Sequence, residues 1–263
     1  QFAKVSVKNH HHSTLNPKAM YQVETPLEVV MNAEMISYPN TKLMCSVNVD
    51  GSAAAVLASE KMARKLGMKR AVKVRASVLT SDPWQERDLV MPDVNTCTRD
   101  AAKIAWEQSG VGPRDINLVE LHDCFSCNEM ITYEALGLCP VGKGGEFVDA
   151  GANTYGGKVV VNPSGGLISK GHPLGATGLA QVSELVWQLR GEAEKRQVKG
   201  AKPAGHATTG RPDDRTTGRL AAFLATRPEF AAKVKDLPAW RAADLPESHR
   251  LMNAATNCST CHQ

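Results

Sequence analysis

Apolar positions follow helical spacing in some segments and alternate with polar positions in others. Ser52 opens an apolar run that predicts a helix as far as Leu66, and Gly67 is typical of a helix end. Alternation between Ala71 and Thr80 predicts a strand. By the same criteria we expect helices over residues 98–110, 126–136 and 178–190, and strands over residues 116–121 and 158–161. Helices alternating with strands indicate an α/β fold in which helices cover central sheets.

The remaining segments are polar and rich in turn-forming residues. We expect residues 1–50 to be irregular with short helices, and residues 81–94 to form a polar loop. The character of the sequence changes near residue 202, and a possible helix over residues 220–234 is interrupted by Pro228. Three regions are therefore predicted: a leading region 1–50, a main domain 51–202, and a divergent tail 203–263.

Composition narrows the class of protein. Of 263 residues, 42% are apolar and 22% are charged, which is typical of a globular chain. The formal net charge is only +4, so there is no electrostatic case for a nucleic-acid partner or an anionic membrane. No apolar run reaches the roughly 20 residues of a membrane span. Seven irregularly spaced cysteines favour reduced thiols in an intracellular protein over a disulfide scaffold.

The first candidate for chemistry is the tetrapeptide from His122 to Phe125, at the end of a predicted strand and the start of a predicted helix. A cysteine in that position can have a lowered pKa, and a neighbouring histidine can polarise a carbonyl or assist proton transfer. Spacing alone still favours a buried Cys124 and a surface His122 without a catalytic role. Cys124 and Cys127 also have two-ligand metal spacing, but no second pair accompanies them, and we expect no metal site.

The second candidate is the glycine-rich stretch from Asn162 to Gly178. Glycines let the backbone approach a ligand closely, and His172 comes just before a helix start with free N–H groups. That arrangement suits a thioester oxygen or a phosphate. The alternative is a tight connection whose glycines serve packing only.

A third pattern lies at the C-terminal end of the sequence. Cys258, Cys261 and His262 have the spacing of covalent c-type haem attachment. Haem attachment requires export, and no signal segment follows Gln1. A solvated terminus is the simpler interpretation.

Taken together and in order, the first two of these candidates closely resemble the sterol-carrier type of the thiolase family. The resemblance runs from about Phe2 to Lys202, and in this family the histidine-rich residues 9–13 are native sequence rather than a tag. The motifs that carry it are Leu121–Ser126, Asn128–Cys139, Asn153–Gly157, Asn162–Gly178 and Trp187–Gly191.

The resemblance implies a layered α/β/α/β/α fold of two similar halves, usually dimerised, of which this chain holds mainly the second half and is incomplete at both ends. It implies acyl transfer between a cysteine and coenzyme A: thiolysis of a 3-oxoacyl-CoA to acetyl-CoA or propionyl-CoA, or the reverse Claisen condensation. Coenzyme A and acyl-CoA would be substrates, with no separate cofactor.

The resemblance also implies roles for particular residues. His122 and His172 would donate hydrogen bonds to thioester oxygens, and His172 would help to activate a cysteine. Cys124 would be the acid and base at the reacting carbon. The residues expected to contact substrate and coenzyme A are Asn162, Ser164, Gly165, Gly166, Gly171 and Gly175.

The sequence departs from the family in two places. The family's nucleophilic cysteine lies upstream of the region that matches Gln1, and no cysteine here replaces it; Cys45 falls behind the expected site. After Lys202 the family's glycine-rich His-Asn strand pair is replaced, and His206 is at most its vestige. A frame change or a fusion would each produce this tail.

The sequence thus predicts the C-terminal part of a thiolase-type acyltransferase that is inactive by itself. The alternatives are a non-catalytic acyl-CoA-binding or assembly subunit and, more remotely, a haem or redox protein acting through Cys258 and Cys261. The expected location is the cytoplasm, or the peroxisome in a eukaryote, although residues 261–263 are not a peroxisomal signal.

Overall fold

The computed structural model describes residues 1–80 and 95–201. Its helices are α1 (Phe2–Thr14), α2 (Leu27–Met31), α3 (Glu60–Lys65), α4 (Asn95–Ser109), α5 (Ser126–Ala135), α6 (Gly144–Asp149) and α7 (Thr177–Arg190). The strands are β1 (Met35–Ser37), β2 (Asn40–Thr41), β3 (Leu118–Val119) and β4 (Val160–Val161). Three short non-α helices complete the set: the 3₁₀ turns η1 (Lys42–Met44) and η3 (Glu194–Arg196) and the π-helical η2 (Gly166–Lys170).

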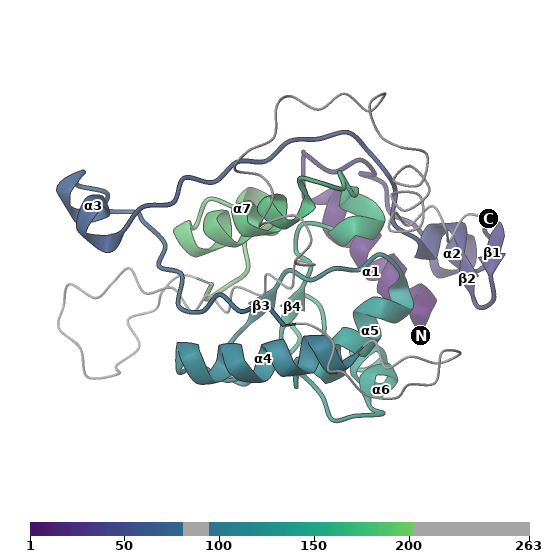
Figure 1. Cartoon of the computed structure of the whole chain (residues 1–263). Coiled ribbons are helices and arrows are strands. Elements are labelled where there is room, and N and C mark those ends of the chain that lie inside the picture. Colours follow the sequence, from purple (N-terminus) through teal and green to yellow (C-terminus); the bar gives the residue numbers. More distant parts are fainter. Residues whose placement is uncertain (81–94, 202–263) are drawn as a thin grey trace, which may run out of the picture.

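Two short parallel strands lie between helical layers. β3 pairs with β4 in parallel, and Figure 1 shows α7 on one side of them and α4, α5 and α6 on the other. Val119 and Val161 are buried in the core with residues of α4, α5 and α6, whereas Leu118 packs against Leu185 and Leu189 of α7. Neighbouring strand residues thus serve opposite faces, as period-two geometry requires. The α/β class and the thiolase-like layering predicted from sequence are confirmed.

Three predicted helices are present near their predicted bounds. α4, α5 and α7 correspond to the ranges expected at 98–110, 126–136 and 178–190. Gly110 and Gly191 follow α4 and α7 with φ values of +66° and +71°, a left-handed conformation that glycine adopts at low cost. The predicted strands at 116–121 and 158–161 are present but shorter, as β3 and β4.

Two predicted elements were wrong. The helix expected from Ser52 begins only at Glu60, where the Ser59 hydroxyl accepts a hydrogen bond from the Met62 amide at 3.2 Å. Residues 71–80 form no strand. Short helices depend on packing of an apolar face, and Val56 and Leu57 are 94% and 83% exposed, so nothing in the described chain supports that face.

The leading region is more regular than expected, because α1 is a 13-residue helix whose buried side is largely polar. Its apolar residues Ala3 and Val5 are buried as well. The division into three regions at 50 and 202 stays a prediction. The expected loop at 81–94 and helix at 220–234 lie outside the described residues.

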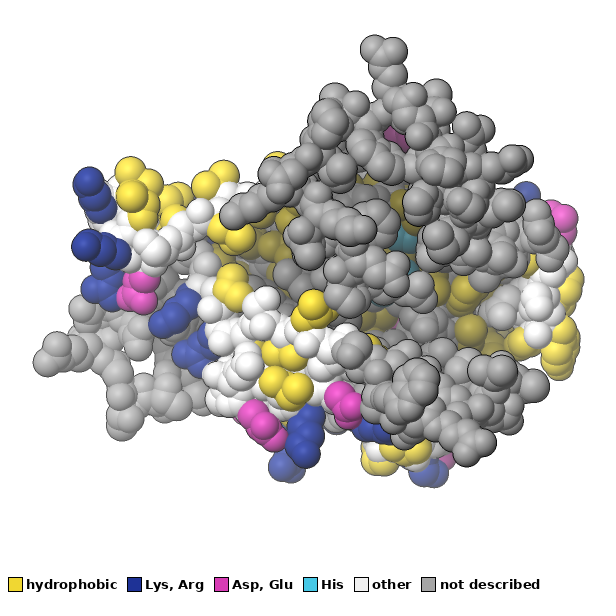
Figure 2. Space-filling view, in the orientation of Figure 1, with side chains coloured by type: hydrophobic (Ala, Val, Ile, Leu, Met, Phe, Trp, Pro, Cys, Tyr) yellow, Lys and Arg dark blue, Asp and Glu magenta, His cyan; other side chains and the backbone are white. Residues whose placement is uncertain are grey.

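Charged and apolar side chains lie side by side on the surface around α3. Figure 2 shows Lys and Arg side chains gathered at the end of the molecule that α3 forms. No residue of α3 is buried. Within residues 1–80 and 95–201, no helix is both long and apolar enough to cross a membrane.

Candidate functional site

The first candidate segment leaves β3 and turns into α5. The Leu121 amide donates to Asn162 Oδ1 at 2.8 Å, which ties the end of this strand to the neighbouring glycine-rich loop. His122 is exposed and Cys124 is half-buried. The Asn128 amide group donates to the His122 carbonyl oxygen at 2.6 Å and holds the turn. The strand end therefore delivers His122 toward solvent and Cys124 toward the protein.

The second candidate segment is a tight loop built from glycine. Gly165 and Gly171 have φ values of +100° and +114°, which other residues rarely adopt. A Cβ at Gly165 would overlap with Ser13 of α1, and one at Gly171 would lie 2.8 Å from Val49. These two glycines allow the backbone to pack closely against its neighbours. At the end of the loop, His172 is only 4% exposed.

A third segment, residues 45–49, joins the two. Its Ser46 amide donates to the Cys124 carbonyl at 2.8 Å, and the His172 amide donates to the Val47 carbonyl at 2.8 Å. Cys45 itself is buried, and its thiol donates to the Thr41 carbonyl at 3.4 Å. The segment thus holds the His122 turn and the His172 loop side by side.

As a result, the two histidines predicted from separate motifs meet. The rings of His122 and His172 have centroids 5.1 Å apart in an edge-to-face arrangement at 85°. His172 Nδ1 lies 2.7 Å from Thr177 Oγ1, and that hydroxyl donates to the Pro173 carbonyl at 3.0 Å. The hydroxyl hydrogen is used, so Nδ1–H is the donor to Thr177. In the neutral ring, Nε2 then carries the lone pair.

An open groove of about 420 Å³ begins at Pro173, the residue after His172. It is lined by residues 49–53 and by residues 173–176, which lead into the N-terminus of α7. A Cβ on Gly175 would meet no atom within 4 Å, so this glycine leaves space rather than filling a contact. Neither His122 nor His172 lines this groove.

The other predicted ligand-binding residues are engaged inside the protein. Asn162 is fully buried; besides Leu121, its side chain contacts Glu129, to which Nδ2 donates at 3.1 Å. The Ser164 amide and hydroxyl both donate to the Glu120 carboxyl at 2.9 Å. Gly166 packs against Asp123. The predicted contacts of these residues with substrate stay a prediction, and the geometry gives them a second role as supports of the loop.

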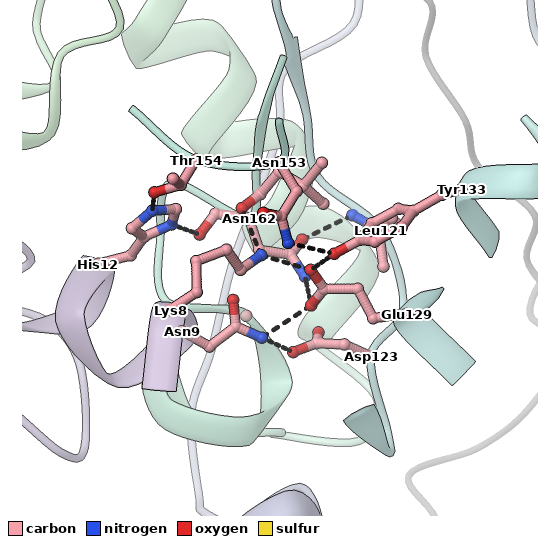
Figure 3. A network of polar contacts seen from close by, with 12 residues as sticks. Lys8, Asn9, His12, Leu121, Asp123, Glu129, Tyr133, Asn153, Thr154 and Asn162 are labelled. Carbon is pink, nitrogen blue, oxygen red and sulfur yellow. Dashed lines mark hydrogen bonds and ion pairs between the residues drawn. The ribbon is translucent and has the colours of Figure 1, made fainter. Parts of the chain in front are cut away.

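A buried polar network links α1 to α5 and to the turn that holds Asp123, as Figure 3 shows. The Lys8 ammonium forms an ion pair with Glu129 and donates to the Val161 carbonyl at 2.9 Å. Tyr133 donates to the same carboxylate. Asn9 Nδ2 donates to Glu129 Oε2 at 2.7 Å and to Asp123 Oδ2 at 2.9 Å. One lysine therefore faces two buried carboxyl groups in this network.

Burial changes the protonation of several of these groups. Burial and the nearby Glu129 raise the pKa of Asp123 well above its usual value. Burial, with Glu184 as a second cause, raises the pKa of Glu120 to about 7. Burial and then Lys8 lower the pKa of His12 to about 3. His12 is therefore neutral, and it links the Asn162 carbonyl, 3.0 Å away, to the Thr154 hydroxyl, 2.8 Å away.

In the part of the chain that the structure covers, no group of three His, Cys, Asp or Glu side chains is arranged to hold a metal ion. Burial raises the pKa of the Cys127 thiol, which disfavours the thiolate that a metal would need. Cys258, Cys261, His262 and His206 lie outside the described residues.

Sequence reasoning missed four contributors to the site: the polar face of α1, residues 45–49, Asp123 and Thr177. The first three form hydrogen bonds to segments far away in the chain, whereas Thr177 bonds to His172 and Pro173 close by; hydrophobic periodicity detects neither kind of contact. The one sequence signal was the unbroken polar run from Lys8 to Ser13, whose side chains are mostly buried.

Comparison with known proteins places this geometry in context. Residues 81–214 match the family described as thiolase C-terminal domain-like. The chain is 54% identical to sterol carrier protein 2 of Oryctolagus cuniculus over 207 residues, which cover 77% of this chain and 38% of that relative. It is 44% identical to the acetyl-CoA acetyltransferase of Methanothermobacter thermautotrophicus over 205 residues, 77% and 52% of the two chains.

A third relative is the benzoylsuccinyl-CoA thiolase subunit BbsB of Thauera aromatica, 43% identical over 75% of this chain and 51% of that protein. A solved structure of an Ltp2-ChsH2(DUF35) aldolase shares the fold with a TM-score of 0.55 and 21% identity, over 74% of this chain and 51% of that one. The chain thus spans between two fifths and about half of the length of these relatives. By its matched domain, the chain belongs to the thiolase family, in its C-terminal part.

Proposed function

We propose that this chain is the C-terminal part of a thiolase-type acyltransferase that makes or breaks the carbon–carbon bond of 3-oxoacyl-CoA. The observation that carries the proposal is the meeting of His122 and His172, with ring centroids 5.1 Å apart. Relatives that are named as a thiolase subunit and as an acetyl-CoA acetyltransferase support the same class of reaction.

In the degradative direction, the nucleophilic thiolate attacks the 3-oxo carbon and the bond between C2 and C3 breaks. The shortened acyl group stays on that sulfur as a thioester until coenzyme A takes it up. The electron pair moves onto the departing thioester as an enolate, which needs hydrogen-bond donors at its oxygen and a proton at C2. His122 would supply one donor, and His172 would supply the second once its Nε2 has taken the proton of the nucleophilic thiol. The Cys124 thiol would supply the proton at C2. The unprotonated Nε2 of His172 is also suited to take a proton from a thiol.

The nucleophilic thiol is expected in a part of the longer protein that these residues do not include, as the length of the relatives suggests. Coenzyme A and acyl-CoA would be the partners, with no separate cofactor, in a homodimer. We place the protein in the cytoplasm, or in the peroxisome of a eukaryotic source.

The test is coenzyme A-dependent loss of acetoacetyl-CoA by the full-length protein that carries this chain. Removing one oxyanion donor typically costs about 10²–10³ in kcat, so His122→Ala and His172→Ala should each lose about that much. Cys124→Ala should still become acylated but should not complete the exchange. Cys139→Ala, at a cysteine buried in the core away from the histidines, is the control and should keep its activity.

Absence of turnover in a folded, full-length protein would refute the catalytic proposal. Calorimetric binding of acyl-CoA without turnover would then favour the alternative, a non-catalytic acyl-CoA-binding or assembly subunit. Equal activity of Cys124→Ala and the wild type would remove Cys124 from its proposed role.

A further inference from the structure

Asp123 lies between the two proposed catalytic residues of its segment, yet it is fully buried and does not face the groove. Its carboxyl group instead reaches the glycine-rich loop. The Leu167 amide donates to Oδ1 at 2.7 Å, and the Ile168 amide donates to Oδ2 at 3.3 Å. These amides belong to the first turn of η2, where backbone N–H groups have no helical partner. Asp123 therefore anchors the start of η2.

The anchored turn leads directly to His172. η2 ends at Lys170, and Gly171 alone separates it from the histidine. The approach of the carboxyl to the backbone is possible because residue 166 is glycine: a Cβ there would overlap with the Asp123 carboxyl group. The contact thus joins the segment of His122 and Cys124 to the loop of His172.

The same carboxyl is held from its other side by α1. Asn9 donates one amide hydrogen to Asp123 and the other to Glu129, which lies on α5. The Asp123 carboxyl consequently fixes three parts of the fold relative to one another: the turn before α5, the loop before His172, and α1. A residue with only a packing role would not need hydrogen bonds to all three.

We infer that Asp123 is a positioning residue of the proposed acyl transfer: it sets the separation of the His122 and His172 rings by holding the first turn of η2 against the His122–Cys124 turn. The inference rests on the proposed function for its catalytic consequence. Its structural consequence, the ring separation, stands apart from that function and can be measured apart from it.

The informative variant is Asp123→Asn. Asparagine has nearly the same shape and still accepts from the Leu167 amide, but its NH2 group opposes the Ile168 and Asn9 donors. The amide donors of Asn9, Leu167 and Ile168 would then compete for one acceptor oxygen, and η2 should shift. A misplacement of about 1 Å can cost about 10²-fold in rate, so we expect kcat to fall by about 10- to 100-fold with KM within about twofold.

Two readouts separate the inference from the proposed function. The first is the nuclear Overhauser cross-peak between the His122 and His172 rings in this chain, which should weaken in Asp123→Asn. The second is the split between kcat and KM in the full-length protein. Asp149→Asn is the matched control: Asp149 is exposed and pairs with Lys4 at the surface, so both readouts should stay at the wild-type level.

If Asp123→Asn fails to fold, Asn9→Ala removes one donor from the same carboxyl and should weaken the cross-peak to a lesser degree. An unchanged cross-peak in a folded variant, or an unchanged kcat in an active enzyme, would overturn the inference. If the wild type shows no thiolysis, the proposed function fails, and the cross-peak alone then decides whether Asp123 positions the rings.

Discussion

Replacing Lys8 by methionine should lower the free energy of unfolding of this chain by about 3–5 kcal/mol near pH 8, the usual cost of removing one partner of a buried ion pair. Lys8 is 8% exposed and its partner Glu129 is fully buried, so water cannot replace the lost ammonium. Asp123 shares the same pocket through Asn9, and two carboxyl groups would be left without a cation in the described network. Methionine keeps most of the lysine stem, which limits the packing loss.

The measurement is urea unfolding followed by circular dichroism, with Lys4→Met as the control. Lys4 lies one turn earlier on α1 and pairs with Asp149 at the surface, where both side chains are more than two fifths exposed. An exposed pair contributes about 0–1 kcal/mol, so this control should change stability little. The contrast between two lysines on one helix isolates the effect of burial.

If an uncompensated charge causes the loss of stability, a second substitution should reverse part of it. Adding Glu129→Gln to the Lys8→Met variant removes one uncompensated carboxylate and should recover part of the lost stability. Purely additive losses in the double variant would show that packing, and not charge, accounts for the effect. Equal effects of Lys8→Met and Lys4→Met would contradict the prediction outright.

Residues near one another in sequence made much of the fold predictable. α5 and α7 follow from apolar spacing with recognisable ends, and β3 and β4 follow from short apolar runs flanked by turns. The helix expected from Ser52 was wrong because its apolar face finds no described partner. α1 was missed for the opposite reason: polar side chains such as Asn9 and His12 point inward, so its hydrophobic pattern is weak.

The site was predictable only as two separate motifs. Their residue types suggested carbonyl chemistry around His122 and His172, but the spacing along the chain does not show that the rings meet. That proximity depends on residues 45–49 and on Asp123, whose partners lie more than 40 positions away. Resemblance to a family supplied what local physics could not, while the roles of Asn162 and Ser164 in binding a ligand stay predictions.

His12, one of two buried histidines of α1, leads to the second large effect, a loss of stability in acid. The pKa of His12 is about 3 in the folded chain and 6.5 for an ordinary histidine. Between about pH 3 and 6.5, therefore, the histidine is protonated in the unfolded state and neutral in the folded state. Stability contributed by neutral His12 is therefore complete above about pH 6.5 and is lost as the pH falls toward 3. Each pH unit in this window costs about 1.4 kcal/mol, or about 4–5 kcal/mol in total.

Glu120 changes stability in the opposite sense and must be separated from His12. Its pKa is raised to about 7, so the folded state holds a proton that the unfolded state releases between about pH 4.5 and 7, and stability falls as the pH rises through that window. The two contributions nearly cancel between about pH 4.5 and 6.5. The free energy of unfolding of the wild-type chain would then change little with pH in that range, although both groups titrate.

The difference between the wild type and His12→Gln isolates the histidine, since Glu120 titrates in both. In urea unfolding at a series of pH values, the stability advantage of the wild type over His12→Gln should shrink by about 1.4 kcal/mol per pH unit below about 6.5. His11→Gln, at the exposed neighbouring position, should leave the shape of the profile unchanged. A constant difference between the wild type and His12→Gln down to pH 4 would mean that His12 accepts a proton without unfolding. In that case burial and the nearby Lys8 ammonium could not be keeping the ring neutral.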